Sequence, residues 1–107
     1  MGYTEKLEAK MLHGEKLRAE EVKDIFLGKT ELNRVGGGLL ESTNDGAVMC
    51  DVVRIVDDYT VPHYYRIKCT RLILGEISYY MQIADEVFPS VRTVFLTKEE
   101  EEILGEE

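Results

Sequence analysis

The chain of 107 residues contains no tryptophan and only two cysteines, two prolines and two histidines. Two cysteines do not make the disulfide framework of a small secreted domain, so we expect Cys50 and Cys69 to be reduced thiols. No apolar run approaches the roughly 18 residues that a membrane-spanning helix needs, and the polar start of the chain shows no signal peptide. The sequence therefore predicts a cytoplasmic protein without a membrane partner.

Motifs for catalysis and metal binding are also missing. His13 and His63 are 50 residues apart, without a Cys-x-x-Cys or His-Glu-x-x-His pattern nearby, so we expect no metal. Gly28-Lys29-Thr30 matches the last residues of a phosphate-binding loop, but Lys23 stands where the first glycine belongs. The sequence thus predicts no catalytic residue and no cofactor, and it favours a protein that is not an enzyme.

Charge of one sign is concentrated in the last third of the chain. The net charge is −8, and residues 75–107 carry nine acidic and two basic side chains. This negative field disfavours nucleic acid as a partner and favours a basic protein. Glu99 and Glu100 are candidate contacts for such a protein, although four glutamates there also suit the first turn of a helix.

Helical periodicity marks the N-terminal region. Apolar side chains at Tyr3, Leu7 and Met11 recur at helical spacing, and a second helix is predicted over residues 17–27, ended by Gly28. Gly14 interrupts the pattern, which leaves open whether these are two helices or one bent helix.

Strand patterns follow over residues 34–43, 47–57 and 62–74. The turn Asn44-Asp45-Gly46 predicts a hairpin between the first two, because these residue types tolerate positive φ. The run Gly36-Gly37-Gly38 weakens the first strand, and the sequence does not explain its purpose.

The region after the hairpin is less regular. Residues 76–88 have helical spacing before Pro89, so we expect a helix, although their composition also fits a strand. A short strand is predicted over 90–96. Thr97 and Glu100 form a capping box that predicts a short C-terminal helix.

The register of hairpin 47–74 decides which side chains are buried. Position numbers summing to 119 would set Cys50 opposite Cys69 and Val52 opposite Ile67, on an apolar face toward the helices. The other face mixes apolar and charged side chains, which is typical of an interface and most simply of a symmetric homodimer. Its apolar members are Met49, Val53, Ile55, Tyr64 and Leu72.

Together these patterns predict one α+β domain over residues 1–107. N-terminal helices (1–31) pack on one face of a mainly antiparallel sheet (32–74), and an acidic helix, strand and helix follow (75–107). We expect a non-catalytic protein-interaction module, comparable with the small acidic inhibitors that phages encode against basic proteins. The candidate partner contacts are Tyr64, Val53, Ile55, Asp57, Asp58, His63, Glu99 and Glu100.

An alternative function is a small-molecule-binding domain or minor enzyme. Its pocket would lie between the helices and the curved sheet, near His63, Tyr65 and Tyr80.

Overall fold

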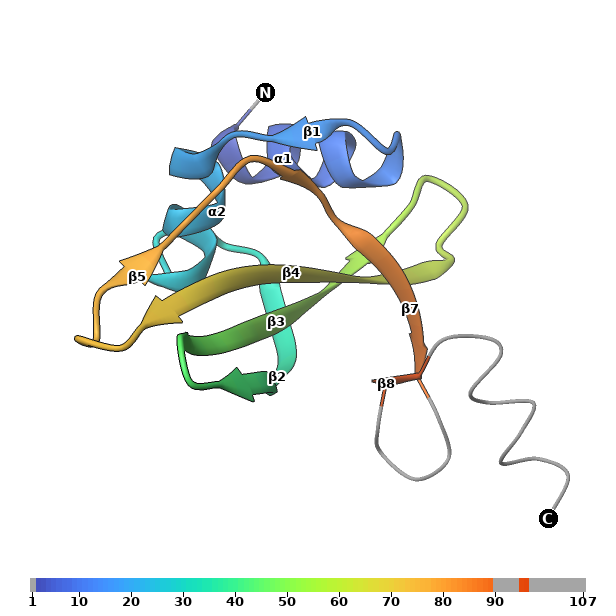
Figure 1. The fold of residues 1–107 in the computed structure, drawn as a ribbon. Coiled ribbons are helices and arrows are strands. Elements are labelled where there is room, and N and C mark those ends of the chain that lie inside the picture. Colours follow the sequence, from blue (N-terminus) through green and yellow to red (C-terminus); the bar gives the residue numbers. More distant parts are fainter. Residues whose placement is uncertain (1, 90–94, 97–107) are drawn as a thin grey trace, which may run out of the picture.

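The computed structural model describes residues 2–89 and 95–96 of the chain. Two helices lie on one face of a mainly antiparallel sheet, so the predicted α+β class is confirmed (Figure 1). The elements are α1 (Tyr3–Leu12), β1 (Lys16–Leu17), α2 (Ala19–Phe26), β2 (Asn33–Thr43), β3 (Gly46–Val56), β4 (Pro62–Leu72), β5 (Ile77–Ser78), β6 (Gln82–Ile83), β7 (Asp85–Pro89) and β8 (Phe95–Leu96). Neither helix of this described part is long and apolar enough to cross a membrane.

Both predicted N-terminal helices are confirmed, and they are separate. Gly14 has a φ of 67°, in the left-handed region that ends α1, and the short strand β1 follows before α2 begins. Gly28 ends the second helix in the same way, with a φ of 72°. The open question of one bent helix or two is therefore settled in favour of two.

A buried carboxylate joins the two helices. Glu21 of α2 is fully buried, and its Oε1 accepts hydrogen bonds from the Arg18 N–H and the Lys10 ammonium, both at 2.8 Å. Burial alone would raise the pKa of Glu21, but the Arg18 N–H and then Lys10 more than reverse this effect, so the pKa is lowered. Glu21 thus caps α2 and links it to α1 while ionised.

The main sheet has the order β2-β3-β4-β7-β8, with β5 also paired to β4. The predicted turn joins β2 to β3, where Thr43 pairs with Gly46. The second edge of β4 is shared, because β5 pairs near one end and β7 near the other. Between them the side-chain amide of Gln82 bonds to both backbone groups of Lys68, at 2.8 Å and 2.7 Å. Gln82 thereby replaces a missing strand partner.

The predicted register of the hairpin is wrong by one residue. Cys50 pairs with Lys68, Val52 with Arg66 and Val53 with Tyr65. The β3–β4 loop sets this register, since Val56 pairs with Pro62 and leaves residues 57–61 outside the ladder. Cys50 and Cys69 consequently point to opposite faces of the sheet, and both are free thiols.

The shifted register exchanges the two faces of β3. Val53 and Ile55, which were predicted on the outer face, are 0% and 1% exposed in the core. The core cluster consists of Leu7, Met11, Leu17, Val22, Ile25, Leu32, Val53, Ile55, Tyr65, Ile67 and Ala84. Val52 is also buried, on the other face, so β3 is apolar on both sides and its alternation is ambiguous.

The predicted helix over 76–88 is wrong, because this segment forms β5, β6 and β7. β5 pairs with the end of β4 that it follows, whereas β7 pairs with the start of β4 and β6 pairs with β1, which are both distant in sequence. These pairings override the local helical spacing. Of the predicted strand 90–96, β8 is described and pairs with β7, whereas the predicted C-terminal helix lies outside the described residues.

Candidate functional site

The loop between β3 and β4, residues 57–61, is held in one conformation by Asp57. Its Oδ1 accepts hydrogen bonds from the backbone N–H groups of Tyr59 and Val61, both at 2.9 Å. The backbone of Asp57 also accepts from the Thr60 N–H at 3.0 Å. Thr60 has a left-handed φ of 62°, a strained conformation that this set of hydrogen bonds supports.

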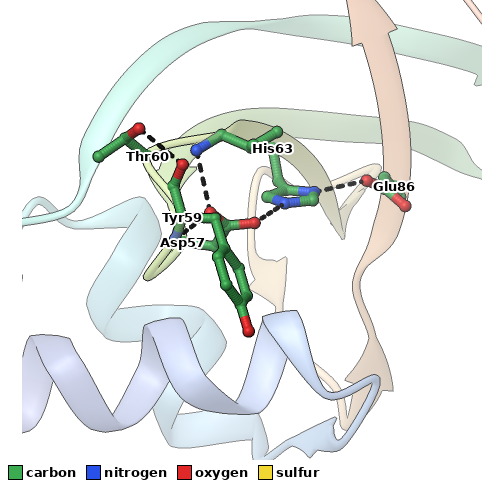
Figure 2. Close-up of polar contacts among 6 residues, drawn as sticks. Asp57, Tyr59, Thr60, His63 and Glu86 are labelled. Atoms are coloured by element: carbon green, nitrogen blue, oxygen red, sulfur yellow. Dashed lines mark hydrogen bonds and ion pairs between the residues drawn. The ribbon is translucent and has the colours of Figure 1, made fainter.

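His63 fastens this loop to the neighbouring strand β7. Its Nε2 lies 2.8 Å from Oδ2 of Asp57, and its Nδ1 lies 3.0 Å from Oε2 of Glu86. Figure 2 shows the imidazole between the two carboxylates. The ring also stacks on Tyr65, with 6.4 Å between ring centroids. One side chain thus connects β4, the loop and β7.

The charges of this cluster support one another. The hydrogen bond to Glu86 and then the one to Asp57 raise the pKa of His63 above its usual value. The pKa of Asp57 is lowered, first by its bond to His63 and then by the Val61 N–H. Both ring nitrogens donate hydrogen bonds to the carboxylates when the imidazole is a cation, and in that state the cluster is an ion triplet with a net charge of −1.

The geometry of the Asp57–His63–Glu86 cluster suits holding the loop in place rather than catalysis. A histidine that acts as a general base needs a free ring nitrogen, and both nitrogens of His63 already bond to carboxylates. The two carboxylates lie at opposite sides of the ring, where they do not converge on one point. In the described part of the chain, no group of three or more His, Cys, Asp or Glu side chains suits a metal ion.

The predicted contact residues fall into four groups. Asp57 and His63 come together at the loop, and the exposed Asp58 lies beside them. Tyr64 lies on the outer face of the sheet, where it pairs with Arg54 and Val87.

Two predicted contacts require correction. Val53 and Ile55 are core residues, which no partner reaches while the domain is folded. Glu99 and Glu100 lie outside the described residues, so their contact with a partner stays a prediction.

Two residues of the site were missed by sequence reasoning. Glu86 lies in the segment that was read as a helix, and only its true pairing with Tyr65 brings it to His63. Tyr59 was not among the predicted contacts, yet it is 85% exposed in the β3–β4 loop. The four-residue run Asp57-Asp58-Tyr59-Thr60, with two acids and a tyrosine, was the available signal.

A second feature is a cavity of about 410 Å³ beside the triple glycine. Asp51 is 3% exposed there and bonds to the Arg34 guanidinium, and burial raises its pKa more than Arg34 lowers it. A Cβ at Gly37 would lie 3.0 Å from the Cys50 carbonyl oxygen and 3.2 Å from Oδ1 of Asp51. The absence of a side chain at Gly37 therefore leaves room for the ion pair of Asp51 with Arg34, which explains one of the three glycines.

The alternative prediction of a ligand pocket between the helices and the sheet stays a prediction, and the residues that line this cavity can be compared with it. The cavity is lined by Phe26, Leu27, Arg34, Gly36, Gly37, Gly38, Met49, Cys50, Asp51, Cys69, Ile77 and Tyr79. His63, Tyr65 and Tyr80 do not line this cavity, and Tyr65 is buried in the core.

Comparisons of the chain with family models, with curated proteins and with solved structures found no match.

Proposed function

We propose that this chain is a non-catalytic protein-interaction module that presents the β3–β4 loop to a basic partner. The observation that carries the proposal is the Tyr59 side chain, 85% exposed on a loop whose backbone is fixed by Asp57. Tyrosine offers a large contact area at low entropic cost. A loop that is ordered before binding loses less entropy when its partner arrives, and this improves affinity.

The charges around Tyr59 favour a basic partner. Asp57 and Asp58 belong to the loop and Glu86 lies beside it. Among the described residues, His63 is the one basic group that pairs with Asp57 and Glu86. Negative groups around an aromatic anchor attract a positively charged surface and align it before contact. The net charge of −8 for the whole chain acts in the same direction over a longer range.

Inhibition of a basic enzyme is the form of this function that the loop suits best. A protruding, rigid acidic loop fits a cleft that binds an anionic substrate, and it would block the cleft without any chemistry of its own.

The test is affinity capture with three tagged forms of the full chain: the native sequence, Tyr59→Ala and Met81→Ala. Met81 is the matched control, since its side chain is 58% exposed on the segment between β5 and β6, outside the loop. Captured proteins from cells of the source organism are quantified by mass spectrometry at low and high salt. We expect a basic protein that is lost with Tyr59→Ala and at high salt, but kept with Met81→Ala.

Equal capture by all three forms would show that the loop is not the binding surface. Circular dichroism of each variant checks that the fold is unchanged, which both exposed positions allow.

A further inference from the structure

The cavity beside the triple glycine has the size of a small-molecule site. Its volume of about 410 Å³ lies within the usual range of ligand pockets. It lies where α2 ends over the sheet, with Phe26 and Leu27 on the helix side and Ile77 of β5 on the strand side. Figure 1 shows that end of α2 above the strands. An apolar cavity of about 150 Å³ already holds benzene, so this one has room for a ring with a short side chain.

Four strand residues of the cavity place their side chains on one face of the sheet, the face that carries the helices. Arg34 pairs with the core residue Val53, and Asp51 lies two residues before Val53 on β3. Met49 lies two residues further back, and its partner on β4 is Cys69. Because side chains alternate between the faces along a strand, all four point to the side of α2. The cavity is therefore one continuous space on one face.

The walls of the cavity are mainly apolar and aromatic. Phe26 and Tyr79 line it as a pair, with 5.9 Å between their ring centroids and 47° between their planes. Cys69 is buried at the inner side, whereas Leu27 and Ile77 are exposed at the rim. A tilted pair of rings with an open approach suits a third aromatic or aliphatic group, which would pack against the rings and be removed from water.

Asp51 and Arg34 are the two charged residues that line the cavity among those that the structure describes. Both oxygens of Asp51 already accept a hydrogen bond, Oδ1 from the Val52 N–H at 3.0 Å and Oδ2 from Nε of Arg34. The two Nη groups of Arg34 carry four further N–H bonds, and none of these donates to another described residue. The cavity therefore offers a ligand hydrogen-bond donors on a positive charge.

We propose that this cavity binds a small carboxylic acid with an aromatic or similarly apolar body. The carboxylate accepts hydrogen bonds from both Nη groups of Arg34, the planar two-bond contact that a guanidinium makes well. The body packs against Phe26 and Tyr79. Asp51 holds Nε of Arg34 and so fixes the guanidinium before the ligand arrives, which reduces the entropic cost of binding.

The charges around Arg34 favour a carboxylate over other ligand classes. An amine would meet the guanidinium as a like charge, and a doubly charged phosphate would add a second negative charge close to the buried Asp51. An uncharged amide or alcohol would accept weaker hydrogen bonds from Arg34, because charge-assisted bonds are roughly twice as strong as neutral ones.

The site is independent of the proposed function. None of Asp57, Tyr59, His63 and Glu86 lines the cavity, so a ligand there leaves the β3–β4 loop untouched. Loss of ligand binding and loss of partner capture are therefore separate results.

The experiment is a titration of the isotope-labelled full chain, followed by the chemical shifts of its backbone amides. The probes are phenylacetate, its uncharged analogue phenylacetamide and the cation phenethylamine. We expect saturable shifts with phenylacetate at the amides of Gly36, Gly37 and Gly38, which line the cavity, and none at Tyr59. The dissociation constants of phenylacetamide and phenethylamine should be about tenfold or more higher.

The matching variant is Arg34→Lys, which keeps a positive charge for Asp51 but removes the planar fork. We expect its dissociation constant for phenylacetate to be about tenfold higher than that of the native chain. Arg71→Lys is the control, since Arg71 is an exposed arginine that does not line this cavity. Circular dichroism and the melting temperature check the fold. If Arg34→Lys fails to fold, the comparison of phenylacetate with phenylacetamide in the native chain decides.

Three results would overturn the proposal. One is the absence of saturable shifts with phenylacetate, which would mean that the cavity takes no ligand of this class. Another is equal binding of phenylacetate and phenylacetamide, which would remove Arg34 from the contact. The third is a set of shifts that leaves Gly36, Gly37 and Gly38 unchanged, because the ligand would then bind elsewhere on the chain.

Discussion

Asp57 and His63 lie on either side of the β3–β4 loop and are joined by a contact of 2.8 Å between Oδ2 and Nε2. This contact and the bond to Glu86 raise the pKa of His63 in the folded state. The stabilisation is therefore complete below the unfolded pKa of about 6.5 and is lost as pH rises through the higher folded value.

The corresponding variant is His63→Gln, which removes the charge. We expect the native chain to melt at a higher temperature than His63→Gln at pH 6, with a difference that decreases toward pH 9. His13→Gln is the control, since His13 is exposed at the end of α1. A difference that increases with pH would contradict the assignment of His63 as a cation between two carboxylates.

Substitution of Val53 by Asp should unfold the protein. Val53 is fully buried among core residues, and an unpaired carboxylate there costs several kcal/mol, which is close to the whole stability of a small domain. Val56→Asp is the matched control on the same strand, because Val56 is 45% exposed. Far-ultraviolet circular dichroism and thermal melting distinguish the two. A folded Val53→Asp would favour the register that the structure contradicts.

Gly46→Ala should destabilise the protein more than Gly38→Ala. The two glycines have nearly the same φ, 142° and 146°, so the backbone strain of an alanine is similar at both. An added Cβ at Gly46 would lie 2.3 Å from the Arg71 carbonyl oxygen, whereas nothing lies within 4 Å at Gly38.

The difference between these two alanine variants measures the steric clash alone. We expect it to be about 1–3 kcal/mol in urea unfolding. Equal stabilities would mean that the β2–β3 turn adjusts freely, and that the pairing of Gly46 with Leu72 is not tightly held.

Glu21→Gln should weaken the junction of the two helices. The substitution keeps one side-chain oxygen as an acceptor, but it removes the negative charge that pairs with Lys10. It also replaces the second oxygen, which accepts from the same ammonium at 3.0 Å, by an amide N–H donor, so we expect a cost of about 2 kcal/mol. The pKa of Glu21 is lowered in the folded state, so its contribution is present above the unfolded pKa and is lost as pH falls through the folded value.

Melting temperatures from pH 7 down to pH 3 check this prediction. The gap between the native chain and Glu21→Gln should narrow in acid. Glu20→Gln, at the exposed neighbouring position, should show no comparable gap at pH 7.

The helices and the first turn were predictable because their signals are local. The spacing of Leu7 and Met11, the C-terminal Gly28 and the sequence Asn44-Asp45-Gly46 each act over a few residues, and the structure confirms all of them. Asp57 and His63 were both named as candidate contacts, and their contact is also local in the sequence, since six residues separate them.

The register and the segment 76–88 were not predictable in the same way, because distant partners decide them. β3 is apolar on both faces, so its alternation fits either register. Asp51 lies on the same face of β3 as Val53 and Ile55, and its charge made this face read as a solvent face in the sequence. The structure shows that Asp51 is buried because Arg34 of β2 pairs with it. In the segment after β4, helical spacing was real but was outweighed by pairing with β4 and β1.

The small ladder of β1 and β6 also affects the order in which the protein folds. It pairs Lys16 with Ile83, and Ala84 follows as a member of the core. The pairing of Leu17 with Gln82 closes a loop of more than 60 residues, and closing so long a loop is slow. The two helices, in contrast, form from local contacts. During synthesis the apolar sides of the helices are therefore incompletely covered until residues 82–84 have left the ribosome. A nascent chain that stalls before Gln82 therefore lacks the β1–β6 ladder and the core contact of Ala84, and part of the apolar surface of the helices stays exposed.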